Sequence, residues 1–567
     1  MLGHFGPGPI ARALLVTHLA IACGDSSGPP ERKVDVSVGS VTIGASQDTL
    51  ILGSQLQINA VVKEVSDTVL PGWPLRWTTS DTTLAVVSLD GLVTPVRPGT
   101  VRVIATSDSG AAVADTLALR LLPRVAALTI TPRPGVLILS DSVQLFAVVT
   151  DSTGAILPGR PIQWGSGGNG VVRADGTVRA VAGGSVLVTA TAEGRLDSLR
   201  IPTNVDAPFV AIAAGDQHTC AITSSGRAYC WGDGFVGQLG DSVIQLGLSP
   251  IPIDPALRFA AITASGSHTC ARTASSTVYC WGYNSYGQVG TSADRNCGYP
   301  CRAVDTVAKV AALPAIATVF TGFEFSCATT AADEAWCWGK NEFGQLGRGT
   351  SDLLFNPIPD TVRALGPAHS FVGGYGHSCA ISAGGIVQCW GTNTVGQLGR
   401  GTVDTLPHLA PAPIAGGLAF VQLTAGQAYT CGLTTGHEAW CWGQATDGKL
   451  GSGTVTQPVE PSPLRVAGNL TWLSISANAD HTCGITTTNK AYCWGNSSFL
   501  ATGNIGGPTP QPVNGNLAFI ALAAGHYHTC GITTTGTAYC WGTGIDGELG
   551  NNSEGASGVP AKVVGQP

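Results

Sequence analysis

The stretch that decides the fold is His218-Thr-Cys-Ala-Ile-Thr-Ser-Ser-Gly-Arg-Ala-Tyr-Cys-Trp-Gly232, closely followed by Gly237-Gln-Leu-Gly240. The same phrase returns six more times, with its Trp at Trp231, Trp281, Trp338, Trp390, Trp442, Trp494 and Trp541. Successive Trp residues lie 47 to 57 positions apart. A period near 50 is typical of propeller blades rather than of helical solenoids. The second half of the chain is therefore an array of seven repeats.

Each repeat has the pattern of a short β-meander. In the first repeat, Phe209–Ala214, Thr219–Thr223 and Arg227–Trp231 are apolar, β-rich runs separated by Gly or Ser. A fourth strand is expected near the end of each repeat, as in Pro458–Val466 and Val559–Val564. Four strands in each of seven repeats predict an all-β fold, a seven-bladed β-propeller.

The cysteines provide a test of this meander. If Ser224–Gly226 is a three-residue hairpin loop with its Gly in the left-handed conformation, Cys220 lies directly opposite Cys230. Such a pair has Cα atoms about 4.5 Å apart, which is within reach of a disulfide. The same ten-residue separation predicts seven disulfides, namely Cys220–Cys230, Cys270–Cys280, Cys327–Cys337, Cys379–Cys389, Cys431–Cys441, Cys483–Cys493 and Cys530–Cys540.

A metal site is the chemical alternative, because His218 and Cys220 point the same way on a strand as Cys230. The repeats themselves weigh against it. Phe325 and Tyr429 replace the His in the third and fifth repeats, whereas both cysteines stay. The sulfur atoms therefore do not need an imidazole partner, so disulfides are favoured and no metal or cofactor is predicted.

Three submotifs recur in order, namely Ala214-Gly-x-x-His218 with its following strand, Ala228-Tyr-x-Trp-Gly232, and Gly237-Gln-Leu-Gly240. Together they resemble the repeat of the regulator of chromosome condensation family over residues 205–567. The sixth repeat lacks the third submotif, and the fifth carries Gly448-Lys-Leu-Gly451. The resemblance implies that the glycines make tight turns, and that the Trp and Leu residues fill the seams between blades.

Composition narrows the choice of partners and compartment. Only 11% of the 567 residues are charged and the net charge is −7, so a nucleic-acid-binding surface is not expected. Seventeen cysteines in this pairing pattern imply an oxidising compartment and therefore export. The expected location is the cell surface or outer membrane, or else the secreted fraction.

Three cysteines lie outside the repeats. Cys297 and Cys301 are in an insertion and are predicted to form a small looped disulfide, with a redox pair as the alternative. Cys23 follows a short apolar run, and residues 1–22 resemble a bacterial lipoprotein signal whose cysteine becomes lipidated, with an ordinary cleaved signal as the alternative. Residues 23–33 would then comprise the lipidated Cys23 and a polar spacer, and the lipid would be the only membrane contact.

Residues 34–204 alternate short β-rich runs with turns, as β-sandwiches do. The run from Trp77 through Val86–Val93 to Gly99–Val103 resembles a bacterial immunoglobulin-like domain of the invasin and intimin type. Residues 124–204 repeat this pattern more weakly, through Gln163–Ser166, Ala174–Val178 and Gly183–Val188. The predicted domains are therefore residues 34–122 and 123–204, followed by the propeller at 205–567.

No nucleophile elbow, phosphate loop or zinc helix is present in recognisable context, so no catalytic residue is predicted. The acids Asp233, Glu342, Asp447 and Asp546 occupy corresponding loops after the Trp and are expected to be solvated. Aromatic residues in turns are better candidates for binding a partner, because they lie outside the blade cores. The candidate partner-binding residues are Phe235, Tyr286, Phe343 and Tyr527.

We therefore expect a non-enzymatic bacterial surface lipoprotein whose propeller binds an unknown protein or glycan. The family resemblance implies an alternative, guanine-nucleotide exchange on a small GTPase, which conflicts with export, disulfides and acidity. A propeller lyase or glycosidase would need His, Glu or Arg side chains at the mouth of the central channel. An enzyme inhibitor, resembling a secreted β-lactamase inhibitor of this propeller class, would need a contiguous aromatic patch on one face.

Overall fold

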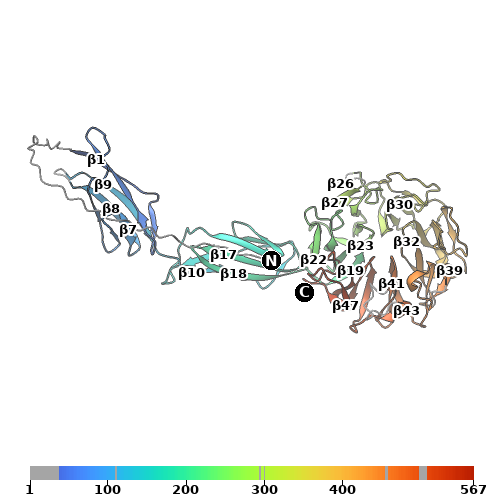
Figure 1. The fold of residues 1–567 in the computed structure, drawn as a ribbon. Coiled ribbons are helices and arrows are strands. Elements are labelled where there is room, and N and C mark those ends of the chain that lie inside the picture. Colours follow the sequence, from blue (N-terminus) through green and yellow to red (C-terminus); the bar gives the residue numbers. More distant parts are fainter. Residues whose placement is uncertain (1–36, 109–111, 293–294, 299–300, 454–456, 497–506) are drawn as a thin grey trace, which may run out of the picture. The chain divides into compact units, whose positions relative to one another are not determined.

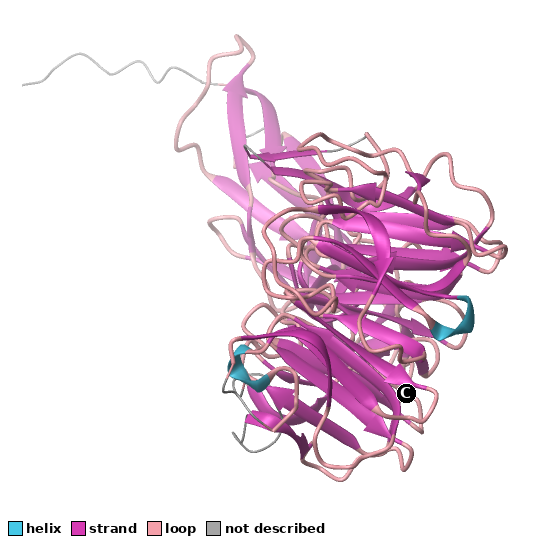
Figure 2. Ribbon diagram, turned by 90° about the vertical axis from the view of Figure 1, so that its right-hand side faces the viewer, coloured by secondary structure: helices cyan, strands magenta, loops and turns pink. Residues whose placement is uncertain are grey.

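The computed structural model describes residues 37–108, 112–292, 295–298, 301–453, 457–496 and 507–567, with the side chains of 295–298 and 301 left out. The chain divides into two compact units, residues 1–124 and 125–567. Strands dominate both (Figure 2), and the described residues form two short 3₁₀ helices, η1 (Ala383–Gly385) and η2 (Thr446–Gly448). The all-β class is confirmed. Cys23 and the predicted signal lie outside the described residues.

The first unit is a β-sandwich with sheets ordered β1-β4, β2-β9-β8-β5 and β3-β7-β6. Alternating apolar side chains such as Val101, Val103 and Leu119 fill its core. The strands are β1 (Val38–Gly44), β2 (Thr49–Ile51), β3 (Leu56–Gln57), β4 (Asn59–Glu64), β5 (Leu75–Thr79), β6 (Ala85–Val87), β7 (Leu92–Pro95), β8 (Gly99–Ser107) and β9 (Ala114–Leu122).

The second unit opens with a sandwich of the same strand order, β10-β13, β11-β18-β17-β14 and β12-β16-β15. The second copy, weak in sequence, thus repeats the topology of the first. Its strands are β10 (Ala127–Thr131), β11 (Leu137–Ile138), β12 (Ser142–Gln144), β13 (Phe146–Thr150), β14 (Gln163–Gly168), β15 (Gly170–Val172), β16 (Thr177–Ala180), β17 (Gly184–Ala192) and β18 (Arg195–Asn204).

The repeats form seven antiparallel sheets within the described part of the chain, each built from consecutive strands. Figure 1 shows β19, β23 and β32 near the centre of the ring and outer strands such as β39 and β47 at its rim. The first three blades are β19 (Phe209–Ala214), β20 (His218–Thr223), β21 (Ala228–Asp233), β22 (Leu246–Pro252); β23 (Phe259–Ser265), β24 (His268–Thr273), β25 (Val278–Tyr283), β26 (Arg295–Gly298), β27 (Cys301–Lys309); and β28 (Ile316–Thr321), β29 (Phe325–Thr330), β30 (Ala335–Gly339), β31 (Asp360–Thr361).

The other four blades follow the same plan. They are β32 (Ala368–Gly373), β33 (His377–Ser382), β34 (Val387–Gly391), β35 (His408–Pro413); β36 (Phe420–Ala425), β37 (Tyr429–Thr434), β38 (Ala439–Gln444), β39 (Val459–Arg465); β40 (Trp472–Asn478), β41 (His481–Thr486), β42 (Ala491–Gly495), β43 (Gly507–Pro512); and β44 (Phe519–Ala524), β45 (His528–Thr533), β46 (Ala538–Gly542), β47 (Ser557–Lys562). Blade 2 gains a fifth strand, β26, from the insertion that contains Cys297.

The hairpin geometry joins the repeat cysteines as expected. Cys220 pairs directly with Cys230 across β20 and β21, and Gly226 has the positive φ of 84° that the loop requires. All seven predicted disulfides with ten-residue separation are present, with Cα–Cα distances of 4.0–4.1 Å. The Cys297 and Cys301 side chains lie outside the described residues, so their disulfide stays a prediction.

A repeated set of hydrogen bonds joins neighbouring blades. In the seam between blades 2 and 3, the Gln288 carbonyl accepts from Trp338 Nε1 at 2.9 Å and from the Ser326 hydroxyl at 2.9 Å. Because that hydroxyl donates to the carbonyl, it accepts from His268 Nε2, 2.9 Å away. Gly290 lies against the Trp338 ring, where a Cβ would come within 3.1 Å of Nε1. The recurring motifs therefore build the seams.

The repeat histidines are buried and uncharged parts of these seams. Burial lowers the pKa of His218, with a smaller contribution from His268, to about 3, and lowers the pKa of His377 to about 4. In blade 5, Tyr429 reaches the next blade instead, and its hydroxyl lies 3.0 Å from Thr482 Oγ1. In the described residues, no group of three His, Cys, Asp or Glu side chains could hold a metal ion.

The ring closes by contact between blade 7 and blade 1, since every blade is made of consecutive strands. Thr219 Oγ1 lies 2.7 Å from His528 Nε2 and donates to the Glu548 carbonyl at 3.1 Å, and Trp231 Nε1 donates to the same carbonyl. The second sandwich shares a hydrophobic core with these two blades, and Val205 N–H donates to the Gly565 carbonyl.

Candidate functional site

In the described part of the chain, the loops that precede a repeat His and the loops that follow a repeat Trp lie at one end of the propeller. This follows from the antiparallel order of the strands, because the first-to-second and third-to-fourth connections of a meander fall at the same end. Hydrogen bonds confirm it in blade 1, where the Asp233 N–H donates to the Gln217 carbonyl at 2.8 Å. We call this end the loop face.

On the loop face, a buried lysine gathers aromatic rings from three blades. Lys340 Nζ lies 4.9 Å from the Tyr286 ring centre and 4.4 Å from the Tyr375 ring centre, and its side chain is only 3% exposed. It donates to Glu324 Oε2 at 2.6 Å and to the Tyr375 hydroxyl at 3.2 Å. Burial opposes the charge, but the hydrogen bond and the charge of Glu324 together raise the pKa of Lys340. The contact with Glu324 thus favours the charged ammonium.

Two further rings extend this cluster outward. The Phe323 and Tyr375 ring centres are 5.2 Å apart, and the Phe343 and Tyr375 centres are 6.5 Å apart. Tyr375 is 41% exposed, whereas Phe323 and Phe343 are half-buried. We call Tyr286, Phe323, Phe343 and Tyr375 the aromatic surface.

An exposed loop of blade 3 adjoins the aromatic surface. Leu353 is 74% exposed and Leu354 is 67% exposed. The loop is held against blade 2, because Asn356 N–H donates to the Tyr286 carbonyl at 2.9 Å. Exposed apolar side chains beside clustered aromatic rings are typical of protein-binding surfaces.

The four candidate partner-binding residues are thus divided. Tyr286 and Phe343 come together in the aromatic surface, where both are half-buried rather than free loop residues. Phe235 is 57% exposed on blade 1, and Tyr527 on blade 7 is stacked on His526, with ring centres 3.9 Å apart. Lys340 was not foreseen, because a single lysine after Trp-Gly carries no signal of its own; the other repeats have Asp233, Tyr283, Thr392, Gln444, Asn496 and Thr543 there.

The acids after the Trp are only partly solvated. Asp447 and Glu342 are exposed as expected, but Asp233 and Asp546 are half-buried at the closing seam. Burial raises the pKa of Asp233, and the charge of Asp546 adds to the shift. Beside them, Glu548 is fully buried, and burial raises its pKa to about 7. The repeat pattern in the sequence did not predict this cluster of Asp233, Asp546 and Glu548.

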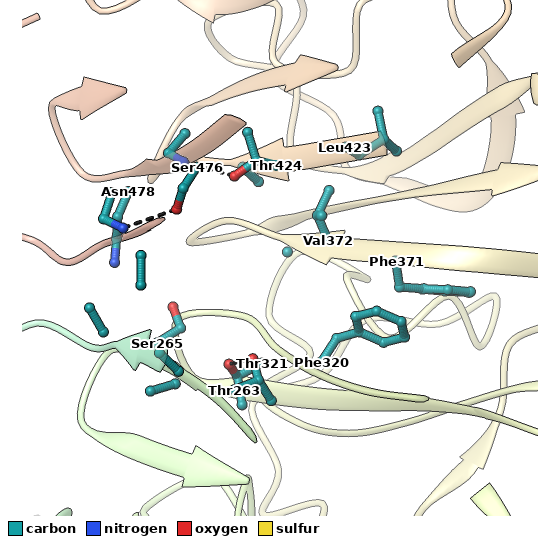
Figure 3. A pocket seen from close by; sticks show the side chains of 18 of the residues that line it. Thr263, Ser265, Phe320, Thr321, Phe371, Val372, Leu423, Thr424, Ser476 and Asn478 are labelled. Atoms are coloured by element: carbon teal, nitrogen blue, oxygen red, sulfur yellow. Dashed lines mark hydrogen bonds between the residues drawn. The ribbon is translucent and has the colours of Figure 1, made fainter. Parts of the chain in front are cut away.

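The central channel contains a cavity of about 390 Å³. Figure 3 shows Thr263 beside Thr321 and Thr424 beside Ser476 among its lining residues. The Thr263 and Thr321 hydroxyls lie 2.8 Å apart, and Thr424 accepts from the Ala477 N–H at 2.8 Å, so these groups already have partners. No charged side chain is among the described residues that line the channel.

The comparison with protein families decides the classification. The sequence model described as "RCC1-like domain" matches residues 158–479, more than half of the chain. The chain belongs to the RCC1-like domain family. The regulator of chromosome condensation (RCC1) repeat matches residues 472–499 and 519–548, and a bacterial Ig-like domain (group 2) matches residues 37–117. The resemblances inferred from the repeats and from the first sandwich are both confirmed.

Individual relatives of this RCC1-like protein are distant. It is 31% identical over 175 residues to the ultraviolet-B receptor UVR8 of Arabidopsis thaliana, covering 30% of this chain and 39% of that protein. It is 31% identical over 263 residues to the RCC1 domain-containing protein RUG3 of the same plant, covering 45% of this chain and 58% of that protein. The chain thus spans less than two thirds of either relative.

A solved structure shows the same fold. Yeast RCC1 (Prp20), in its complex with Kap60, has a TM-score of 0.53 and 22% sequence identity, covering 64% of this chain and 84% of that chain. At this identity the likeness concerns the propeller fold alone. In the described part of the chain, no helix is long and apolar enough to cross a membrane.

Proposed function

We propose that this chain is an interaction protein displayed on a bacterial surface, and that its propeller binds a protein partner through the aromatic surface. A lipid on Cys23 would anchor it, and the two immunoglobulin-like domains would form the arm. The match to a bacterial Ig-like domain and the seven disulfides support export. Yeast RCC1, which shares the propeller fold, is itself found bound to another protein, Kap60.

The observation that carries the proposal is the aromatic surface itself. The Tyr286 and Tyr375 rings lie against Lys340. Phe323 and Phe343 pack against Tyr375, which remains 41% exposed. These rings do not form part of a blade core, because the core is filled by residues such as Trp390 and Leu398. Rigid, partly exposed aromatic residues supply contact area with little loss of side-chain entropy on binding.

The test compares two surface variants with a control on the same blade. Tyr375→Ala and Phe343→Ala are each expected to weaken binding of the partner about 10-fold, because each removes a ring contact worth ~1–2 kcal/mol. Ile386→Ala removes a 52% exposed side chain of blade 4 at the opposite end and should bind normally. The full-length exported protein is the bait for cell-surface proteins, and the purified partner is then titrated.

Melting temperatures of all three variants separate binding from folding. Equal affinity of the two surface variants and the Ile386 control would overturn the proposal. A loss of partner binding that only matches each variant's loss of folded protein would also overturn the proposal.

Enzyme inhibition is a second candidate function. It requires a contiguous aromatic patch on one face, and the aromatic surface is such a patch. An inhibitor would bind at the mouth of a secreted enzyme's active site, so the purified partner would lose its activity when titrated with the protein.

A further inference from the structure

The loop face carries carboxylates in the loops before the repeat His and after the repeat Trp-Gly. They include Asp216, Asp233, Glu324, Glu342, Asp447, Asp480 and Asp546. Glu324 and Glu342 belong to the cluster around Lys340, and Glu342 is exposed. The aromatic surface is therefore set in an acidic surrounding.

Arg302 is exposed on the loop face and lies over the Phe355 ring, whereas four other cations are used internally. Lys449 is 1% exposed and is bound to Asp480 at 2.5 Å, just as Lys340 is bound to Glu324. Arg348 donates to the Cys337 carbonyl at 2.7 Å, and Arg400 donates to the Cys389 carbonyl at 2.5 Å. These cations reinforce the blades and cannot turn outward to meet a partner without breaking those bonds.

The opposite end of the propeller carries exposed charges of both signs. Arg258, Arg363 and Lys562 are exposed there, and so are Asp254 and Glu334. The sign of the partner's charge is therefore argued from the loop face alone.

The position of Lys340 shows which chemistry the loop face accommodates. Its ammonium is held between two tyrosine rings and the carboxylate of Glu324. An aromatic ring and a carboxylate near Lys340 are also accessible from outside: Tyr375 is 41% exposed and Glu342 is exposed. An aromatic ring next to a carboxylate attracts Lys and Arg side chains through cation–π and ionic contacts.

We propose that the partner of the aromatic surface is a protein that presents a cationic segment, with Lys or Arg side chains over Tyr375 and beside Glu342. This inference rests on the proposed function and specifies the chemistry of the partner. Charge complementarity favours this occupant, because an acidic segment would meet the exposed carboxylate of Glu342, whereas a cationic segment would pair with it.

The test uses a fluorescent hexalysine peptide, with hexaglutamate as the control probe, titrated into the full-length protein by anisotropy. We expect hexalysine to bind at least 10-fold more tightly than hexaglutamate, and to bind more weakly as salt screens the charges. Glu342→Gln should weaken hexalysine binding at least 3-fold. Glu334→Gln makes the same charge change in an exposed turn of the same blade at the opposite end and should have no effect.

Tyr375→Ala distinguishes the aromatic surface from a general acidic surface. It should weaken hexalysine binding at least 5-fold without changing the salt dependence, whereas Ile386→Ala should not. Equal binding of the two peptides, or equal effects of Glu342→Gln and Glu334→Gln, would overturn the cationic partner. If the natural partner still requires Tyr375 but ignores Glu342 and salt, the proposed function stands and this inference falls.

Discussion

Glu548 occupies a position that other blades give to glutamine, and replacing it tests the account of the seams. In blades 1 to 4 the equivalent Gln is buried and accepts a backbone N–H through Oε1, as Gln397 does from Val395 at 3.0 Å. Glu548 accepts the corresponding bond from the Asp546 N–H at 2.8 Å, but its Oε1 is buried without a partner. Asp546 and Asp233 are the other charged groups that act on it.

The magnitude follows from the pKa. Burial raises the pKa of Glu548 from 4.5 to about 7. Below pH 4.5 the carboxyl is protonated in both states and costs nothing. As pH rises from 4.5 to about 7, the unfolded chain releases the proton while the folded chain retains it, so the free energy of unfolding falls. Above pH 7 the loss reaches ~3 kcal/mol, at ~1.4 kcal/mol for each pKa unit. Glu548→Gln should therefore gain up to ~3 kcal/mol at pH 8 and almost nothing at pH 4.

The assay is unfolding of full-length protein by guanidinium across pH 4–9, with the variant compared with the parent at each pH. The difference isolates Glu548 from the seam histidines, whose pKa values burial lowers and which therefore destabilise the fold at acid pH in both proteins. Gln397→Glu is the matched reverse change in another seam and should cost a similar amount at pH 8. A stability difference that is independent of pH, or that favours Glu548 at pH 8, would refute the reasoning.

Other predictions concern the anchor, the crosslinks and the blade cores. Cys23→Ser should abolish acylation and release the protein from the membrane fraction, and unchanged retention would contradict the anchor. Mass spectrometry under non-reducing conditions should find Cys297 linked to Cys301 in addition to the seven repeat disulfides; a free thiol at either position would contradict this. Trp390→Ala should cost ~3–5 kcal/mol through a cavity in a seam, measured by thermal unfolding, whereas a small shift would mean that the seam collapses. Lys340→Met should destabilise the protein measurably, because it leaves Glu324 partly buried without its cation, and an unchanged melting temperature would show that the rings alone hold this cluster.

The sequence by itself determined the repeat architecture, because the physical rules involved are local. A hairpin loop of fixed length places residues ten apart on facing strands, so Cys220 and Cys230 had to meet. Replacement of the repeat His by Phe325 and Tyr429 already weighed against a shared metal site. The seams were foreseen only in part: the Trp was expected there, but not the Gln carbonyl that accepts its Nε1–H.

Only the tertiary structure decided where the candidate site lies. Tyr286, Lys340 and Tyr375 belong to three different blades, and nothing in their separate loops tells that the ammonium lies over both rings. The same holds for Asp233 and Glu548, which are 315 residues apart and meet only because the last blade packs on the first. Strand pairing follows from spacing within one repeat. Which loops meet depends on how the blades pack around the ring, and that packing cannot be predicted from the sequence of any single repeat.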